Sequence, residues 1–304
     1  MSAPLHLDVT LIFCHTDHMN STLRLKDGST THYWQYGDET KPAIVMVHGF
    51  RGTHHGLEKI VRQLKEFRVI VPDLPGFGES EPFTTGAHTL DRYVSFVDEF
   101  IKQVAPNEKP VLLGHSFGSI VASHYAVEKP KTIKKLVLIN PIGAPALKGP
   151  KAALTQLAVF YYWLGRTLPA NLSHIWLSSQ ASTDIMTLIM TKTKDKDMRA
   201  FIRDQHRQHF STFSNPRVVS EAFNASVGHD VREVAVQLTV PTLLIAGEKD
   251  DVTPLEKQRQ LAGLIKNSKL HIIHNVGHLI HYETSDEAAQ VIHEWVTAPV
   301  ASIK

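Results

Sequence analysis

The sequence predicts an α/β protein with a mostly parallel, doubly wound sheet and one inserted helical cap. From Ala43 onward, short apolar runs alternate with amphipathic stretches, which is the pattern of parallel strands joined by crossover helices. No strand pattern is found over residues 141–236, and the alternation resumes at Val240. We therefore expect a core of residues 1–140 and 237–304, with residues 141–236 as the cap.

The first part of the chain predicts antiparallel strands at one edge of the sheet. Residues 5–13 alternate apolar and polar side chains with one lapse, which is typical of a strand. A second run at 21–25 leads into the turn sequence Lys26-Asp27-Gly28-Ser29 and then into residues 30–36. Two such runs around a short Gly-containing turn predict a hairpin.

The remaining elements follow in order along the chain. Further strands are predicted at 43–47, 68–71, 110–114, 134–139 and from 240, and helices at about 56–65, 89–104, 117–129, 254–265 and 285–297. Thr253-Pro254 is typical of an N-cap followed by the first helical residue. Thr284 with Glu287 is typical of a capping box.

Residues Gly114-His115-Ser116-Phe117-Gly118 join a predicted strand to a predicted helix. In that context the pattern G-x-S-x-G predicts a nucleophile elbow, with the serine hydroxyl exposed on a sharp turn. The turn is so tight that side chains in place of the two glycines are expected to collide with their surroundings. The helix N-terminus behind the serine favours developing negative charge. Ser116 is the predicted nucleophile.

The partners that a serine nucleophile needs follow two later strands. A serine hydroxyl is weak unless a base accepts its proton, and an acid orients that base. Asp250 and Asp251 follow the apolar run 240–246, and His278 follows the run 270–274. Carboxyl ends of parallel strands meet at one edge of a sheet, where open α/β sheets bind ligands. We expect Ser116, one of the two aspartates and His278 to meet there.

Five motifs in this order resemble the α/β-hydrolase superfamily over nearly the whole chain. They are His48-Gly49-Phe50, Asp73-Leu74-Pro75-Gly76-Phe77-Gly78-Glu79-Ser80, the elbow, Gly247-Glu248-Lys249-Asp250 and Gly277-His278. The resemblance implies the α/β-hydrolase fold with a cap, and a triad in the chain order Ser, Asp or Glu, His. It implies Asp250 rather than Asp251 as the acid. Some relatives place the acid after the sixth strand, where this chain has Asn140.

The resemblance also implies an oxyanion hole made by two backbone N–H groups. One belongs to Phe117, directly after the nucleophile, and the other to Phe50, after His48-Gly49. The His48 side chain is expected to brace this loop rather than to carry protons.

The predicted cap is rich in large apolar side chains. They could line an apolar acyl pocket or form the core of the cap itself, and they are Phe160, Tyr161, Tyr162, Trp163, Trp176, Met186 and Met190. The candidates for substrate binding are Tyr161, Tyr162, Trp163 and Trp176. An apolar cap would favour medium or bulky acyl groups. His206, Arg207 and His209 are expected on a solvated helix face.

Composition and motif content indicate which partners, location and cofactors to expect. The net charge of +2 gives no reason to expect a nucleic-acid partner. The single Cys14 excludes an internal disulfide framework, and no signal-peptide pattern is found, so a cytoplasmic location is expected. The apolar stretch around 157–164 is too short to span a membrane. No metal-ligand spacing, dinucleotide or Walker pattern is found, so no metal or cofactor is expected.

These observations predict a cofactor-free serine hydrolase that cleaves a small-molecule carboxylic ester or acyl substrate through an acyl-enzyme. The same triad would serve a C–C bond hydrolase of ring-cleavage type. That group usually carries Asn before the nucleophile and Trp after the histidine, where this chain has His115 and Leu279. Acyl transfer to another acceptor and a ligand-sensing, non-enzymatic role are the remaining alternatives.

Overall fold

The structure is a computed structural model that describes residues 18–144, 152–210 and 212–299. Over these residues, one sheet has eight strands in the order β1-β2-β4-β3-β5-β6-β7-β8. The strands are β1 His18–Arg24, β2 Thr30–Tyr36, β3 Ala43–Val47, β4 Arg68–Pro72, β5 Val111–His115, β6 Lys135–Ile139, β7 Thr242–Gly247 and β8 Ser268–Ile273. β2 pairs antiparallel with β1 and β4, and all other neighbours are parallel. This confirms the predicted fold class; the strand predicted at 5–13 lies outside the described residues.

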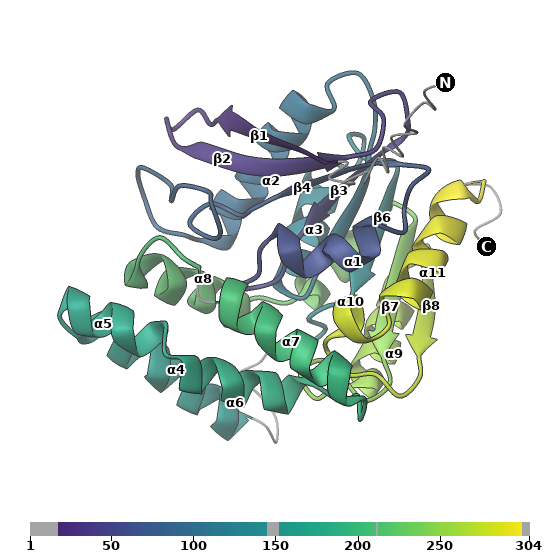
Figure 1. Cartoon of the computed structure of the whole chain (residues 1–304). Coiled ribbons are helices and arrows are strands. Elements are labelled where there is room, and N and C mark those ends of the chain that lie inside the picture. The colour runs from purple at the N-terminus through teal and green to yellow at the C-terminus, as the bar shows by residue number, and fades with distance from the viewer. Residues whose placement is uncertain (1–17, 145–151, 211, 300–304) are drawn as a thin grey trace, which may run out of the picture.

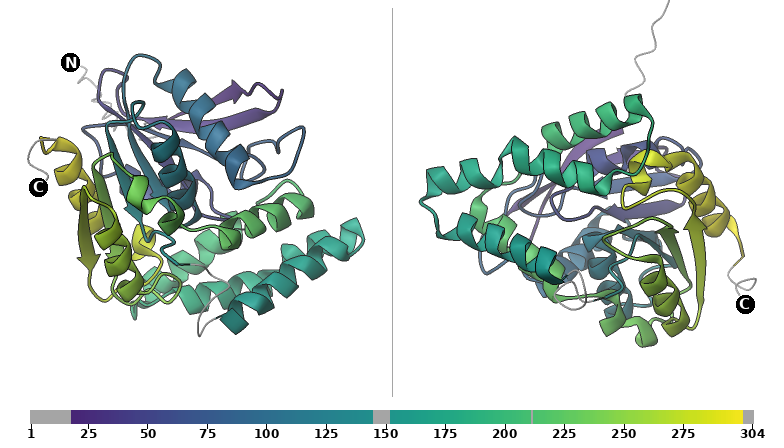
Figure 2. Two further views of the ribbon diagram at one scale, coloured as in Figure 1. Left: turned by 180° about the vertical axis from the view of Figure 1, so that it is seen from behind. Right: turned by 90° about the horizontal axis from the view of Figure 1, so that it is seen from below.

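Helices cover both faces of the sheet. Figure 1 shows α1 (Glu58–Val61), α10 (Ile280–Glu283) and α11 (Ser285–Thr297) in front of the strands. The view from behind in Figure 2 shows α2 (Leu90–Val104), α3 (Phe117–Glu128) and α9 (Leu255–Leu264) on the other face. Successive side chains of a strand point to opposite faces, so Val45 packs with the α2 and α3 face and Ile44 with the α1 and α11 face. Burial on both faces explains why these strands are continuous apolar runs.

The cap lies between β6 and β7 and is helical. Its helices are α4 Ala152–Thr167, α5 Ala170–Leu177, α6 Gln180–Met190, α7 Lys196–His209 and α8 Pro216–Gly228, gathered below the sheet in Figure 1. The start of α8 follows from its sequence, because Asn215 accepts a hydrogen bond from the Val218 N–H and Pro216 occupies the first turn. Val218 and Val219 then pack in the same cluster as α2 and α3, which joins cap and core.

Three local predictions differ from the structure. The helix expected at 56–65 is a 3₁₀ turn, His54–Leu57, followed by the short α1. Helix α9 begins at Leu255, with Pro254 rather than Thr253 in the N-cap position. Thr284 precedes α11 but makes no capping bond, because its hydroxyl donates to the Ile280 carbonyl of α10.

Candidate active site

Ser116 sits on a strained corner between β5 and α3. Its φ of 53° lies in a region that residues with side chains rarely adopt. The two flanking glycines make the corner possible. A Cβ at Gly114 would lie 2.2 Å from the Gly118 carbonyl oxygen, and a Cβ at Gly118 would lie 2.2 Å from the Val47 carbonyl oxygen. Both contacts are with backbone that cannot move aside, so only glycine fits at either position.

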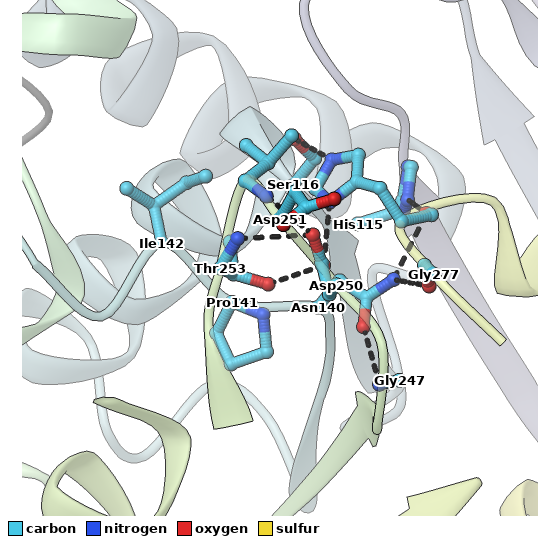
Figure 3. A network of polar contacts seen from close by, with 12 residues as sticks. His115, Ser116, Asn140, Pro141, Ile142, Gly247, Asp250, Asp251, Thr253 and Gly277 are labelled. Atoms are coloured by element: carbon cyan, nitrogen blue, oxygen red, sulfur yellow. Dashed lines mark hydrogen bonds and ion pairs between the residues drawn. The ribbon is translucent and has the colours of Figure 1, made fainter. Parts of the chain in front are cut away.

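A continuous chain of hydrogen bonds links the three residues that the sequence analysis singled out. His278 Nε2 lies 2.9 Å from Ser116 Oγ, and His278 Nδ1 lies 2.8 Å from Asp250 Oδ2. The serine follows β5, the aspartate follows β7 and the histidine follows β8, so all three meet at the carboxyl edge of the sheet. Figure 3 shows Ser116 and Asp250 at this edge.

Asp250 is held as a buried, ionised carboxylate. Its Oδ1 accepts the N–H groups of Val252 at 2.7 Å and Thr253 at 3.0 Å, and the Thr253 hydroxyl donates to its Oδ2. Burial alone would raise the pKa of Asp250, but the charge and hydrogen bond of His278 and the bonds from Thr253 outweigh it and hold the pKa at about 2. Asp251 is instead exposed, and its carboxylate pairs with Lys192 Nζ at 2.6 Å.

Asn140 braces this edge, which the sequence analysis did not foresee. It follows β6 with a φ of 43°, a conformation that asparagine tolerates better than most residues. Its side-chain amide donates to the His278 carbonyl at 2.9 Å and accepts the Gly247 N–H at 2.9 Å (Figure 3). Asn140 therefore ties the loop that carries the histidine to the end of the strand that precedes the aspartate.

The loop after β3 lies directly against the serine. A Cβ at Gly49 would lie 3.2 Å from the Ser116 Cβ. His48 braces this loop, because its Nδ1 bonds the Gly49 carbonyl at 2.8 Å and its Nε2 accepts the Leu74 N–H at 2.8 Å. Phe50 continues the loop and Phe117 opens α3, so the two predicted oxyanion donors approach Ser116 from the loop and from the helix. Their role stays a prediction.

A small cavity of about 70 Å³ opens beside the serine. Its most frequent lining residue is histidine, from both core and cap: His48, His115, His206, His209, His278 and His281. Burial lowers the pKa of His115 to about 3, with the neighbouring His278 adding to the effect, and burial lowers the pKa of His206 to about 4. These two rings are therefore neutral near pH 7 and act as hydrogen-bonding groups without charge.

The prediction of a solvated face at 206–209 was wrong for His206. His206 is buried, and its Nδ1 lies 2.8 Å from the Thr187 hydroxyl of α6. His209 stacks on His55, and of the three predicted residues only Arg207 is exposed, in an ion pair with Asp184. The spacing from Ile202, which is also buried, is four residues and was the available signal for an inward position of His206.

The four predicted substrate residues do not line this cavity. Tyr162 is buried with its ring stacked on Phe223 at 4.1 Å, and Tyr161 and Trp176 pack on one another. Trp163 is 50% exposed. Helix α4 uses Tyr161 to pack against α5 and Tyr162 to pack against α8. Among the apolar candidates of the cap, only Met190 reaches the cavity.

The part of the chain that the structure describes contains neither a candidate membrane-spanning helix nor a candidate metal site. None of its helices is long and apolar enough to cross a membrane. Across the same residues, no group of three or more His, Cys, Asp or Glu side chains could hold a metal ion.

Residues 38–285 match the family described as serine aminopeptidase, S33. The chain belongs to this family of α/β-hydrolases. Among its relatives, the uncharacterized hydrolase YugF of Bacillus subtilis is 24% identical over 89% of this chain and 95% of its own length. Lipase 1 of Psychrobacter immobilis is 24% identical over 88% of this chain and 81% of its own length.

Solved structures agree on the fold of this S33-family hydrolase. The esterase EaEST of Exiguobacterium antarcticum superposes with a TM-score of 0.76 at 19% identity, covering 92% of this chain and all of that one. At that identity the likeness concerns the fold, including the helical segment inserted into the sheet.

Proposed function

We propose that the protein hydrolyses carboxylic esters with short acyl groups, using Ser116 as nucleophile, His278 as base and Asp250 as the acid that orients the base. The observation that carries the proposal is the hydrogen-bonded chain from Ser116 through His278 to the buried carboxylate of Asp250. A lipase among the relatives and an esterase among the proteins of this fold support the same reaction class.

The geometry supports a two-step reaction. His278 Nε2 takes the proton of Ser116 Oγ as the oxygen attacks the ester carbonyl, and then gives it to the departing alcohol. Asp250 keeps Nδ1 as the protonated nitrogen and stabilises the imidazolium that forms. The N–H groups of Phe50 and Phe117 would hold the oxyanion. Water activated by His278 then releases the acid and frees Ser116.

The lining of the cavity favours ester hydrolysis over the aminopeptidase activity for which the family is named. An aminopeptidase must hold the free ammonium group of its substrate, and a buried ammonium needs a carboxylate partner. The described residues that line the cavity include no aspartate or glutamate, whereas they include Arg51. An uncharged acyl group suits this site better than a positively charged amino acid.

The size of the cavity favours a short acyl chain, in contrast to the medium or bulky groups expected from the apolar cap. About 70 Å³ has room for roughly five water molecules. Six histidines line the cavity, and the cap aromatics Tyr161, Tyr162, Trp163 and Trp176 do not. We therefore propose acetyl to butyryl esters rather than fatty acyl esters as substrates.

Hydrolysis of p-nitrophenyl esters from acetate to palmitate tests this proposal, with Ser116→Ala as control. We expect the highest kcat/KM for the shortest chains and a loss of about 10⁴-fold or more in the variant. Amino-acid p-nitroanilides serve as the peptidase comparison and should not be cleaved.

Two results would contradict the proposal in different ways. No ester turnover, while a fluorophosphonate still labels Ser116, would exclude ester hydrolysis and favour C–C bond cleavage, acyl transfer or ligand sensing. Failure of a folded protein to react with the fluorophosphonate would instead remove Ser116 from its proposed role.

A further inference from the structure

Arg51 occupies a position in the loop next to Ser116 that arginine rarely takes. It follows Phe50 and has a φ of 58°, in the left-handed region. The Gly52 N–H donates to the Gly49 carbonyl at 3.0 Å, so Gly49 to Gly52 form a tight turn with Arg51 at its third position. Positive φ there is typical of glycine or asparagine. An arginine needs support from elsewhere to stay in this conformation.

That support comes from the cap. The Arg51 side chain is buried, and its Nε donates to the Phe210 carbonyl at 3.0 Å, just after α7. One terminal nitrogen donates to the Leu177 carbonyl, the last residue of α5, at 2.9 Å, and the other lies 3.4 Å from the Tyr162 hydroxyl of α4. The guanidinium also lies over the Phe210 ring at 4.8 Å. One core side chain thus contacts three separate segments of the cap.

We propose that Arg51 is a positioning residue that couples the seating of the cap to the shape of the oxyanion loop. The Phe50 N–H belongs to the same planar peptide unit as the Gly49 carbonyl. The turn hydrogen bond from the Gly52 N–H to that carbonyl therefore fixes the direction of the Phe50 N–H, and this bond needs the left-handed conformation of Arg51. With the cap in place, the cap carbonyls hold Arg51 left-handed and the turn closed. The proposal rests on the proposed function, because it assigns a use to the predicted oxyanion donor.

The physical basis is that a buried guanidinium must keep its donors satisfied. Fixed carbonyl acceptors at the ends of α5 and α7 satisfy two of them in a way that a shifted cap could not. Movement of the cap would expose the Arg51 side chain to water. The hydrogen bonds to the Leu177 and Phe210 carbonyls, which hold Arg51 in its left-handed conformation, would then be lost. The donor would then lose the fixed direction that stabilises the oxyanion.

Four variants distinguish the contacts of the Arg51 side chain with the cap from the left-handed conformation of the turn. Arg51→Gly keeps, and even favours, a positive φ but removes the side chain. Arg51→Met removes the charge and the donors, while Arg51→Lys retains a cation with fewer directed bonds. Arg203→Met is the matched control, because Arg203 is an exposed arginine on α7. Thermal melts of all four check that they fold, and Arg51→Lys is the mildest of the changes at residue 51.

Two readouts decide the question. For p-nitrophenyl acetate we expect Arg51→Gly and Arg51→Met to lower kcat by about 10- to 100-fold with little change in KM, and Arg51→Lys to fall between them and the wild type. In limited proteolysis we expect the cap of Arg51→Gly to be cut at least several-fold faster than that of the wild type or Arg203→Met.

The outcomes distinguish this inference from the proposed function. Wild-type kcat in Arg51→Gly would mean that the turn alone suffices and would overturn the coupling, even with Ser116-dependent turnover established. If the wild type cleaves no ester, the proposed function fails, and the proteolysis still decides whether Arg51 anchors the cap. Equal cap cleavage in Arg51→Gly and wild type would overturn that anchoring.

Discussion

Asp250 and Asp251 are adjacent in sequence but lie in opposite environments. Asp250 is enclosed by two backbone N–H groups, the Thr253 hydroxyl and His278, whereas Asp251 points to solvent and pairs with Lys192. The turn after β7 produces this difference. A carboxylate can stabilise an imidazolium only when it is fixed against the ring, so the two aspartates are expected to respond differently to the same substitution.

Asp250→Asn should lower kcat for short esters by about 10³- to 10⁴-fold, because the amide favours the wrong tautomer of His278. Asp251→Asn is the matched control and should keep kcat within about twofold, as an exposed ion pair contributes little. Steady-state kinetics with p-nitrophenyl acetate makes the comparison. Equal losses in both variants would contradict the assignment of the acid.

The buried histidines should make the fold sensitive to acid. Burial lowers the pKa of His206 from 6.5 to about 4 in the folded protein. Between pH 6.5 and 4, the His206 ring is therefore neutral in the native state but protonated in the unfolded chain. The free energy of unfolding should therefore fall by about 1.4 kcal/mol per pH unit for such a ring between pH 6.5 and 4.

Urea unfolding at pH 7, 6 and 5 measures this dependence. His206→Asn keeps an amide near the Thr187 hydroxyl but removes the titration, so it should reduce the slope between pH 6 and 5 by about 1 kcal/mol per unit. An unchanged slope would show that His206 is not the source of the acid sensitivity.

At the residue scale, the sequence predicted best where position along a strand determines placement. Ser116 and His278 each follow a strand end, so topology alone brings them near one another. The cap contacts of His206 and Arg51 were not predicted, because their partners come from cap segments whose relative packing the sequence does not show; these partners are Thr187 and the carbonyls of Leu177 and Phe210.

Among the elements, the elbow is the least tolerant of change. Gly118→Ala would place a methyl group against the backbone of β3 and should lower the free energy of unfolding by about 3 kcal/mol or more. Gly263→Ala is the matched control, because Gly263 is exposed on α9 and a Cβ there meets no atom within 4 Å. It should raise stability by about 0.5 kcal/mol through reduced freedom of the unfolded chain.

Chemical denaturation of both glycine variants measures whether each substitution lowers or raises the free energy of unfolding. A Gly118→Ala protein as stable as the wild type would show that α3 can move away from β3. That result would also remove the structural reason for glycine at this end of the elbow.

Helix starts were the least predictable elements, because capping residues have competing partners. Thr253 was expected to cap α9, but its hydroxyl bonds Asp250 and the helix begins one residue later than expected. Thr284 was expected to cap α11, but the preceding turn of α10 takes its hydroxyl. Asn215-Pro216, which has no such competitor among the hydrogen bonds seen, caps α8 in the usual way.

For the whole molecule, the sheet divides into a protected centre and weaker edges. Every residue of β3, β5, β6 and β7 is buried, whereas β1 and β8 are mostly half-exposed or exposed. Amide exchange should therefore be slowest in the central strands, where it requires global unfolding, and faster in the two edge strands. Hydrogen exchange followed by mass spectrometry checks this order, and β8 as slow as β5 would contradict it.

The overall architecture was predictable because both faces of the central strands are covered, which leaves a continuous apolar signal in the sequence. The character of the cavity was not. It depends on how the cap sits over the sheet edge, and the aromatic rings of α4 turned to α5 and α8 instead.

The order of the three proposed catalytic residues along the chain has a consequence for biosynthesis. The ribosome makes Ser116 and its elbow first, then the whole cap, then the strand before Asp250, and the histidine only after β8. Until that last strand docks, a nascent chain carries a serine hydroxyl without a base and cannot be acylated efficiently. Efficient acylation of Ser116 is therefore expected only after β8 has joined the sheet, and chains terminated before β8 should not react with esters.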